Sequence, residues 1–204
     1  MTRLCRGRRA LLPVLIAGLV SFALGLVAFA SSETDKASPG AISVPADGLP
    51  AITLIDQQGR PLSLASLKGR PALVAFIHTQ CEGPCELITG HMKQVAQTLG
   101  AGFHSEVTMI SITTEPEEDR SSELLAYAKA QGVEGRGWVF LTGASANIRR
   151  LLALYGVLAE EKKSDHVLEL FLLAADGAAM RRYNGVTTPV QAIAADIRKT
   201  AALH

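Results

Sequence analysis

The chain has 204 residues, which is enough for one ordinary domain and a short appendage. It carries 20 Lys and Arg against 19 Asp and Glu, so its formal net charge is only +1. The first thirty residues, called the leader below, hold several of the basic residues, so the remainder is mildly acidic. This charge excludes a broad basic surface for nucleic acid.

The first thirty residues have the pattern of a membrane-targeting segment. An uncharged, mostly apolar run over residues 10–30 approaches the roughly 20 residues of a membrane-spanning helix and exceeds the usual signal-peptide core of about 7–15. A basic start precedes the run and is formed by Arg3, Arg6, Arg8 and Arg9. We expect residues 1–30 to be an anchor, with a signal cleaved after Ala28-Phe29-Ala30 as the alternative. Either form sends the remainder across the membrane.

The next segments lead into a folded domain. Residues 31–48 are rich in small residues, Pro and Gly, and indicate a flexible linker before a domain over residues 49–204. Residues 51–56 predict a strand and residues 62–67 a short second element. Residues 72–77 are continuously apolar, as expected for a strand buried on both faces of a sheet.

Helices and strands then alternate. Apolar residues at helical spacing follow Cys85 until Gly100, which predicts a helix that ends there. A strand, a helix, a strand and a helix are expected next, over residues 107–112, 123–129, 138–141 and 146–155, the last capped by Ser145.

The chain is predicted to close with a β-hairpin and a helix. Residues 167–174 and 180–183 are the expected strands, joined at the turn Asp176-Gly177. Thr188 is expected to cap the last helix, with Pro189 in its first turn. This order of elements predicts an α/β sandwich of the thioredoxin type.

Cys81 and Cys85 are the only thiols after the leader. A disulfide that closes so short a loop removes little entropy from the unfolded chain, so a redox or metal pair is favoured over a structural one. A loop between a buried strand and a helix delivers both thiols to the positive end of the helix, which stabilises thiolates. Gly83 supplies a bend and Pro84 suits a first helical turn.

The spacing of the cysteines separates two kinds of site. Thiol–disulfide exchange in this fold uses two residues between the cysteines, whereas three lie between Cys81 and Cys85. Residues four apart share one helix face, so the two sulfurs can converge without bonding to each other. Two soft thiolates suit Cu(I), and an added imidazole is acceptable to copper in either oxidation state.

The sequence resembles the Sco/SenC family of copper proteins that assist assembly of cytochrome c oxidase. The resemblance is carried by Phe76-Ile-His-Thr-Gln-Cys81 with Cys85, by Asp165-His166 and by the hairpin residues 170–177. Shorter similar stretches lie at 111–112, 124–128, 138–143 and 154–157.

The resemblance implies a thioredoxin-like domain that binds copper, as Cu(I), Cu(II) or both, through Cys81, Cys85 and His166. Asp165 is expected to support the imidazole rather than to bind the metal. The implied partner is the copper-bearing subunit of cytochrome c oxidase, with other copper chaperones or thiol–disulfide oxidoreductases as further partners. The short basic leader favours a bacterial inner membrane with the domain in the periplasm, or a soluble periplasmic protein if the leader is cleaved.

Three roles use the same residues. A metallochaperone would hold copper and pass it to the oxidase by ligand exchange. A membrane-anchored thiol–disulfide reductase, which would be an enzyme, would keep cysteines of the oxidase copper site or of other extracytoplasmic proteins reduced. A copper or redox sensor is the third. The distant His166 separates the first from the second, because dithiol exchange needs no imidazole.

Two departures from the family pattern concern the surroundings of the site. His78 stands where the family has an aromatic residue, and we expect it to hydrogen-bond to the loop backbone and support the site, with a fourth metal ligand as the alternative. The acidic stretch 113–119 replaces an Asp-Pro-rich loop and is expected to be solvated. His104 is expected to lie in a loop, and His91, His104 and His204 are all expected to be structural or surface residues.

Overall fold

The computed structural model describes residues 49–81, 83–135, 137–157 and 168–203. The expected anchor (1–30) and linker (31–48) lie outside these ranges, so both stay predictions. Within the described part of the chain, no helix is both long enough and apolar enough to cross a membrane.

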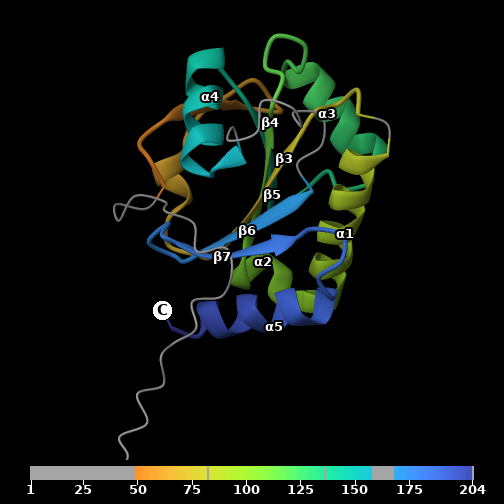
Figure 1. Ribbon diagram of the computed structural model, residues 1–204, viewed down its shortest axis with the longest axis vertical. Helices are drawn as coiled ribbons and strands as arrows, with labels where there is room; N and C mark the ends of the chain where they lie inside the picture. Colours follow the sequence, from red (N-terminus) through yellow and green to blue (C-terminus); the bar gives the residue numbers. More distant parts are fainter. Residues whose placement is uncertain (1–48, 82, 136, 158–167, 204) are drawn as a thin grey trace, which may run out of the picture. The chain divides into compact units, whose positions relative to one another are not determined.

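One mixed sheet forms the centre of the domain (Figure 1). In the described residues its strands follow the order β2-β1-β5-β4-β3-β6-β7. The central strands β3, β4 and β5 run parallel, and the remaining neighbours pair antiparallel. The strands span Thr53–Asp56 (β1), Pro61–Ser63 (β2), Ala72–Ile77 (β3), Thr108–Thr113 (β4), Trp138–Thr142 (β5), Glu169–Leu173 (β6) and Ala179–Asn184 (β7).

Helices cover both faces of this sheet (Figure 1). The helices α1, α3 and α5 contribute to one apolar cluster, and α4 contributes to the cluster on the opposite face. Their bounds are Pro84–Leu99 (α1), Phe103–Glu106 (α2), Ser121–Ala130 (α3), Ser145–Leu154 (α4) and Val190–Ala201 (α5), with short 3-10 turns at Leu64–Leu67 and Gly100–Gly102. This architecture confirms the predicted thioredoxin-like α/β sandwich and its late hairpin.

The strand that leads into the cysteines lies at the centre of the core. All six residues of β3 are buried, as its continuous apolar sequence predicts. Alternate side chains enter opposite clusters: Leu73, Ala75 and Ile77 face α1, whereas Val74 and Phe76 face α4. A strand packed on both sides gives the loop at its carboxyl end a rigid base.

Three local predictions differ from the structure. Pro189 is the N-cap of α5 rather than its first helical residue, because its ψ of 133° is extended. Ser145 is the first residue of α4, and its hydroxyl donates to Glu117 instead of capping the helix. The short helix α2, which contains His104, was expected to be a loop because four residues are too few to show helical periodicity.

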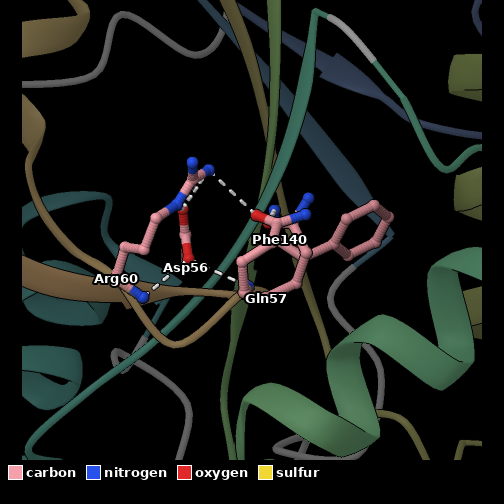
Figure 2. A network of polar contacts seen from close by, with 5 residues as sticks. Asp56, Gln57, Arg60 and Phe140 are labelled. Carbon is pink, nitrogen blue, oxygen red and sulfur yellow. Dashed lines mark hydrogen bonds and ion pairs between the residues drawn. The ribbon is translucent and has the colours of Figure 1, made fainter.

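A polar network closes the β1–β2 turn and adds a link between β1 and β5 (Figure 2). The buried carboxylate of Asp56 accepts hydrogen bonds from the backbone N–H groups of Gln58 and Arg60 and from the Arg60 side chain. The side-chain oxygen of Gln57 accepts the backbone N–H of Phe140 at 3.0 Å. Gln57 thus continues the pairing of β1 with β5 beyond the last paired residue of β1.

Candidate metal centre

The two cysteines lie at the junction of β3 and α1, as the sequence predicts. β3 ends at Ile77 and α1 begins at Pro84, with Cys81 in the loop and Cys85 in the first turn of the helix. Gly83 precedes the helix with φ of 98°, a left-handed conformation that strains other residues. Both the expected bend at Gly83 and the expected position of Pro84 are confirmed.

Both cysteines are free of a disulfide and both are buried, each with 5% of its surface exposed. The backbone N–H of Cys85 donates to Sγ of Cys81 at 3.3 Å. This amide belongs to the first helical turn and has no acceptor within the helix, so the sulfur serves as its cap. Cys81 therefore lies at the positive end of α1, which stabilises negative charge on its sulfur.

The pKa of the Cys85 thiol differs from the sequence expectation that the helix end favours the thiolate form. Burial raises the pKa of the Cys85 thiol to about 12, and the neighbouring Cys81 side chain adds to the rise, while the backbone of His78 opposes it. Loss of hydration outweighs the effect of the helix end at this position. The prediction that both thiols have lowered pKa values is therefore wrong for Cys85.

The His78 side chain lies close to both thiols. One ring nitrogen of His78 and the sulfurs of Cys81 and Cys85 all lie within 4.8 Å of one another. The carbonyl of His78 also accepts the backbone N–H of Cys81 at 3.4 Å, which folds the loop into a turn. The described part of the site is thus one imidazole and two thiols from a single short segment.

This donor set fits a soft metal ion. Metal–sulfur bonds of about 2.3 Å and metal–nitrogen bonds of about 2.0 Å place donors around one ion roughly 3.5–4 Å apart. The three donor atoms already lie within 4.8 Å of one another, so shifts of about an ångström would bring them into range. Thiolate and imidazole are ligands that copper and zinc prefer, whereas magnesium and calcium prefer oxygen.

Asp119 holds the loop between β3 and α1 through hydrogen bonds to its carboxylate. Its carboxylate is 1% exposed and accepts the backbone N–H of Thr79 at 3.1 Å and the Thr79 hydroxyl at 2.5 Å. It also accepts the hydroxyl of Thr113 at 2.5 Å. The expectation of a solvated stretch 113–119 is therefore wrong at both ends, because β3 and β4 run parallel and their following loops lie side by side.

A small hollow opens beside this carboxylate. It has a volume of about 190 Å³ and is lined by His78, Gln80, Glu115, Glu118 and Asp119. Glu115 and Glu118 are exposed and line the hollow together with His78. Negative charge around a concave entrance attracts cations.

Tyr127 fixes the other side of the site from α3. Its hydroxyl donates to the carbonyl oxygen of Cys85 at 2.9 Å and also contacts the hydroxyl of Thr89 at 2.9 Å. Burial raises the pKa of Tyr127 above its usual value, so the phenol keeps its proton. Neither Tyr127 nor Asp119 was expected from the sequence to take part in the site.

The remaining predicted site residues, Asp165 and His166, lie outside the described residues. The described chain resumes at Leu168, whose carbonyl accepts the backbone N–H of Gly185 at 2.8 Å. A Cβ atom built at Gly185 would lie 2.8 Å from Ile88 and 3.3 Å from the Leu168 oxygen. Leu168 is therefore close to the part of α1 around Ile88, which lies about one helical turn after Cys85.

Comparison with known proteins identifies the family. The SCO1/SenC family model matches residues 44–202. The SCO1 protein homolog of Bacillus subtilis is 34% identical over 158 residues, which cover 74% of this chain and 81% of that protein.

Solved structures show the same likeness. BsSco, a member of the Sco family of cytochrome c oxidase assembly proteins in which a disulfide switch has been identified, is 31% identical, with a TM-score of 0.67 over 77% of this chain and 95% of that chain. ScoI of Bradyrhizobium japonicum with copper bound has the same fold at 24% identity, with a TM-score of 0.63 over 75% and 99% of the two chains. The chain belongs to the SCO1/SenC family.

Proposed function

We propose that this chain is a copper metallochaperone that delivers copper to cytochrome c oxidase and holds the ion through Cys81, Cys85 and His166. The observation that carries the proposal is that the free thiols of Cys81 and Cys85 converge beside the His78 imidazole after the end of β3. Two relatives support it: ScoI of Bradyrhizobium japonicum has been solved with copper bound, and BsSco belongs to a family of oxidase assembly proteins.

The position of His166 in the chain supports its proposed role as a copper ligand. It precedes Leu168 by two residues, which span at most about 7 Å in an extended chain. Leu168 packs against the apolar cluster that contains Cys81 and Cys85. An imidazole two residues upstream therefore has a short path to the sulfurs.

The chemistry of transfer follows from the donor set. Each cysteine gives up its thiol proton when its sulfur bonds to the ion, and neutral imidazole supplies a nitrogen lone pair. A donor of the target subunit then bonds to the ion as one ligand of this chain leaves, so the ion moves without a change in its oxidation state. In the proposed setting an N-terminal segment anchors the domain on the periplasmic side of a bacterial inner membrane.

Replacement of His166 tests the proposal. We expect His166→Ala to weaken Cu(I) binding by the full-length reduced protein at least about tenfold, because a ligand is lost. Competition against a chromogenic Cu(I) chelator measures the affinity, and His104→Ala, which changes an exposed histidine on α2, is the matched control. Equal affinities of the two variants would show that His166 is not a ligand.

A thiol–disulfide reductase is the second candidate, favoured by one contact. The Cys85 N–H that points at Cys81 stabilises a thiolate on Cys81, which would attack a target disulfide, while Cys85 keeps its proton until it resolves the mixed disulfide. The target disulfide gains the two electrons and the Cys81–Cys85 pair is oxidised. Unchanged disulfide reduction by His166→Ala would favour this role alongside copper binding.

A further inference from the structure

The strongest feature not used by the proposed ligand set is the imidazole of His78. Strand alternation would send this side chain away from the face of Ile77, which packs in the same cluster as both cysteines. β3 ends at Ile77, however, and the turn closed by the His78 carbonyl and the Cys81 N–H redirects the chain. The His78 ring therefore lies with the thiols rather than across the sheet from them.

The position of the ring satisfies the distance requirement for a ligand. A residue that only supports a metal site hydrogen-bonds to a ligand and lies one atom layer further from the ion. The ring nitrogen of His78 is within 4.8 Å of both sulfurs, so a single ion can contact all three atoms. No other group of three His, Cys, Asp or Glu side chains within the described ranges meets this requirement.

The surroundings of His78 give a cation access to it. The residue is half-buried, whereas both cysteines are almost fully buried. His78 lines the 190 Å³ hollow together with Glu115 and Glu118. A cation in this hollow would lie beside two exposed carboxylates and His78, which is itself within 4.8 Å of both sulfurs.

From these contacts we infer that His78 is itself a copper ligand. This inference rests on the proposed function, because it adds a donor to the same site. Residues 78–85 then form a three-donor site of two thiolates and one imidazole that does not require His166. With His166 bound as well, the ion has two imidazoles and two thiolates, and one imidazole can leave for a target ligand while the other keeps hold of the ion.

Substitution of His78 in the full-length reduced protein tests the inference. His78→Phe keeps a ring of similar size without a donor atom, and we expect it to lower Cu(I) affinity at least about tenfold. His104→Phe on α2 is the matched control and should bind Cu(I) as the unmodified chain does. Electron paramagnetic resonance of the Cu(II) form should show one coupled nitrogen fewer in His78→Phe than in the control.

A second variant separates ligation from support of the fold. His78→Ala leaves a gap beside the thiols that free imidazole can enter, so added imidazole should restore most of the lost Cu(I) affinity. Imidazole has no such effect if His78 only stabilises the loop. Circular dichroism of both variants checks that the domain is folded.

The outcomes distinguish this inference from the proposed function. If His78→Phe binds like His104→Phe while Cys81→Ser abolishes binding and His166→Ala weakens it, His78 is not a ligand and the proposed site stands. If His78→Phe weakens binding and His166→Ala does not, the three-donor site stands and His166 is not a ligand. If Cys81→Ser retains full affinity, both the inference and the proposed function are wrong.

Discussion

At the scale of single residues, Asp119 connects the cysteine loop to the sheet. Among the described residues, the hydrogen bonds of its buried carboxylate go to Thr79, which follows β3, and to Thr113, which ends β4. Charge-assisted hydrogen bonds contribute about 1.5–3 kcal/mol each, and a buried donor left without an acceptor costs about 1–3 kcal/mol. The loop conformation therefore depends on a side chain 38 positions after Cys81.

We expect Asp119→Ala to reduce the free energy of unfolding by about 2–4 kcal/mol, because the half-buried Thr79 N–H and the buried Thr113 hydroxyl lose their acceptor. Urea denaturation of the reduced protein measures the change. Glu118→Ala removes an adjacent exposed carboxylate and should cost less than about 0.5 kcal/mol. A loss in Asp119→Ala no larger than that in Glu118→Ala would contradict a supporting role for Asp119.

The sequence reveals the site residues that are neighbours along the chain, but not those that tertiary structure brings to the site. Cys81 and Cys85 were predicted because strand, loop and helix are consecutive in the chain and their spacing carries chemical meaning. Asp119 and Tyr127 come from segments whose relation to the loop depends on the order of strands in the sheet, which periodicity does not encode. His78 is expected from the sequence to support the site as a strand-end histidine bonded to the loop backbone, because the turn that brings its ring to the thiols leaves no mark in the apolar spacing.

At the scale of elements, continuous and periodic segments were predicted well and short ones poorly. β3 and α1 have the expected bounds to within a few residues, because their apolar residues follow one period over many positions. The four-residue helix α2 and the start of α5 were misassigned, because caps and single turns depend on backbone angles rather than on apolar spacing. The polar network of the β1–β2 turn is likewise not predictable from apolar spacing (Figure 2).

Asp56 in this turn makes the stability of the fold depend on pH. Burial alone would raise its pKa, but hydrogen bonds from Arg60 and Gln58 outweigh that effect and lower the pKa below the usual value. The stabilisation is therefore complete above the pKa of the unfolded chain, about 3.9, and is lost as pH falls through the lower folded value.

We expect Asp56→Asn to destabilise the protein by about 1–3 kcal/mol at pH 7, and by progressively less as pH falls below about 4. Denaturant titrations of the variant and the unmodified chain at pH 7 and at pH 3 measure this difference. Glu134→Gln, which neutralises an exposed carboxylate, should give a small difference at either pH. A penalty for Asp56→Asn that stays constant between pH 7 and pH 3 would contradict the assignment.

At the scale of the whole molecule, the thiols are part of the core. Cys81 and Cys85 belong to the cluster that joins β3 to α1, α3 and α5. The donor atoms are consequently held together only while this cluster is packed. An ion that bonds to all of them binds the folded chain in preference to the unfolded one, and binding energy becomes folding energy.

Copper should therefore stabilise the entire domain, by about 2.7 kcal/mol when free Cu(I) is one hundred times the dissociation constant. Thiols four positions apart also bind copper in an unfolded chain, which reduces the gain, whereas an imidazole placed by the fold restores the preference for the native state. We thus expect urea denaturation to show a larger copper-induced gain in the unmodified chain than in His78→Phe, and none in the double variant Cys81→Ser, Cys85→Ser. Equal gains in the unmodified chain and the double variant would mean that copper stabilises the protein from some other site.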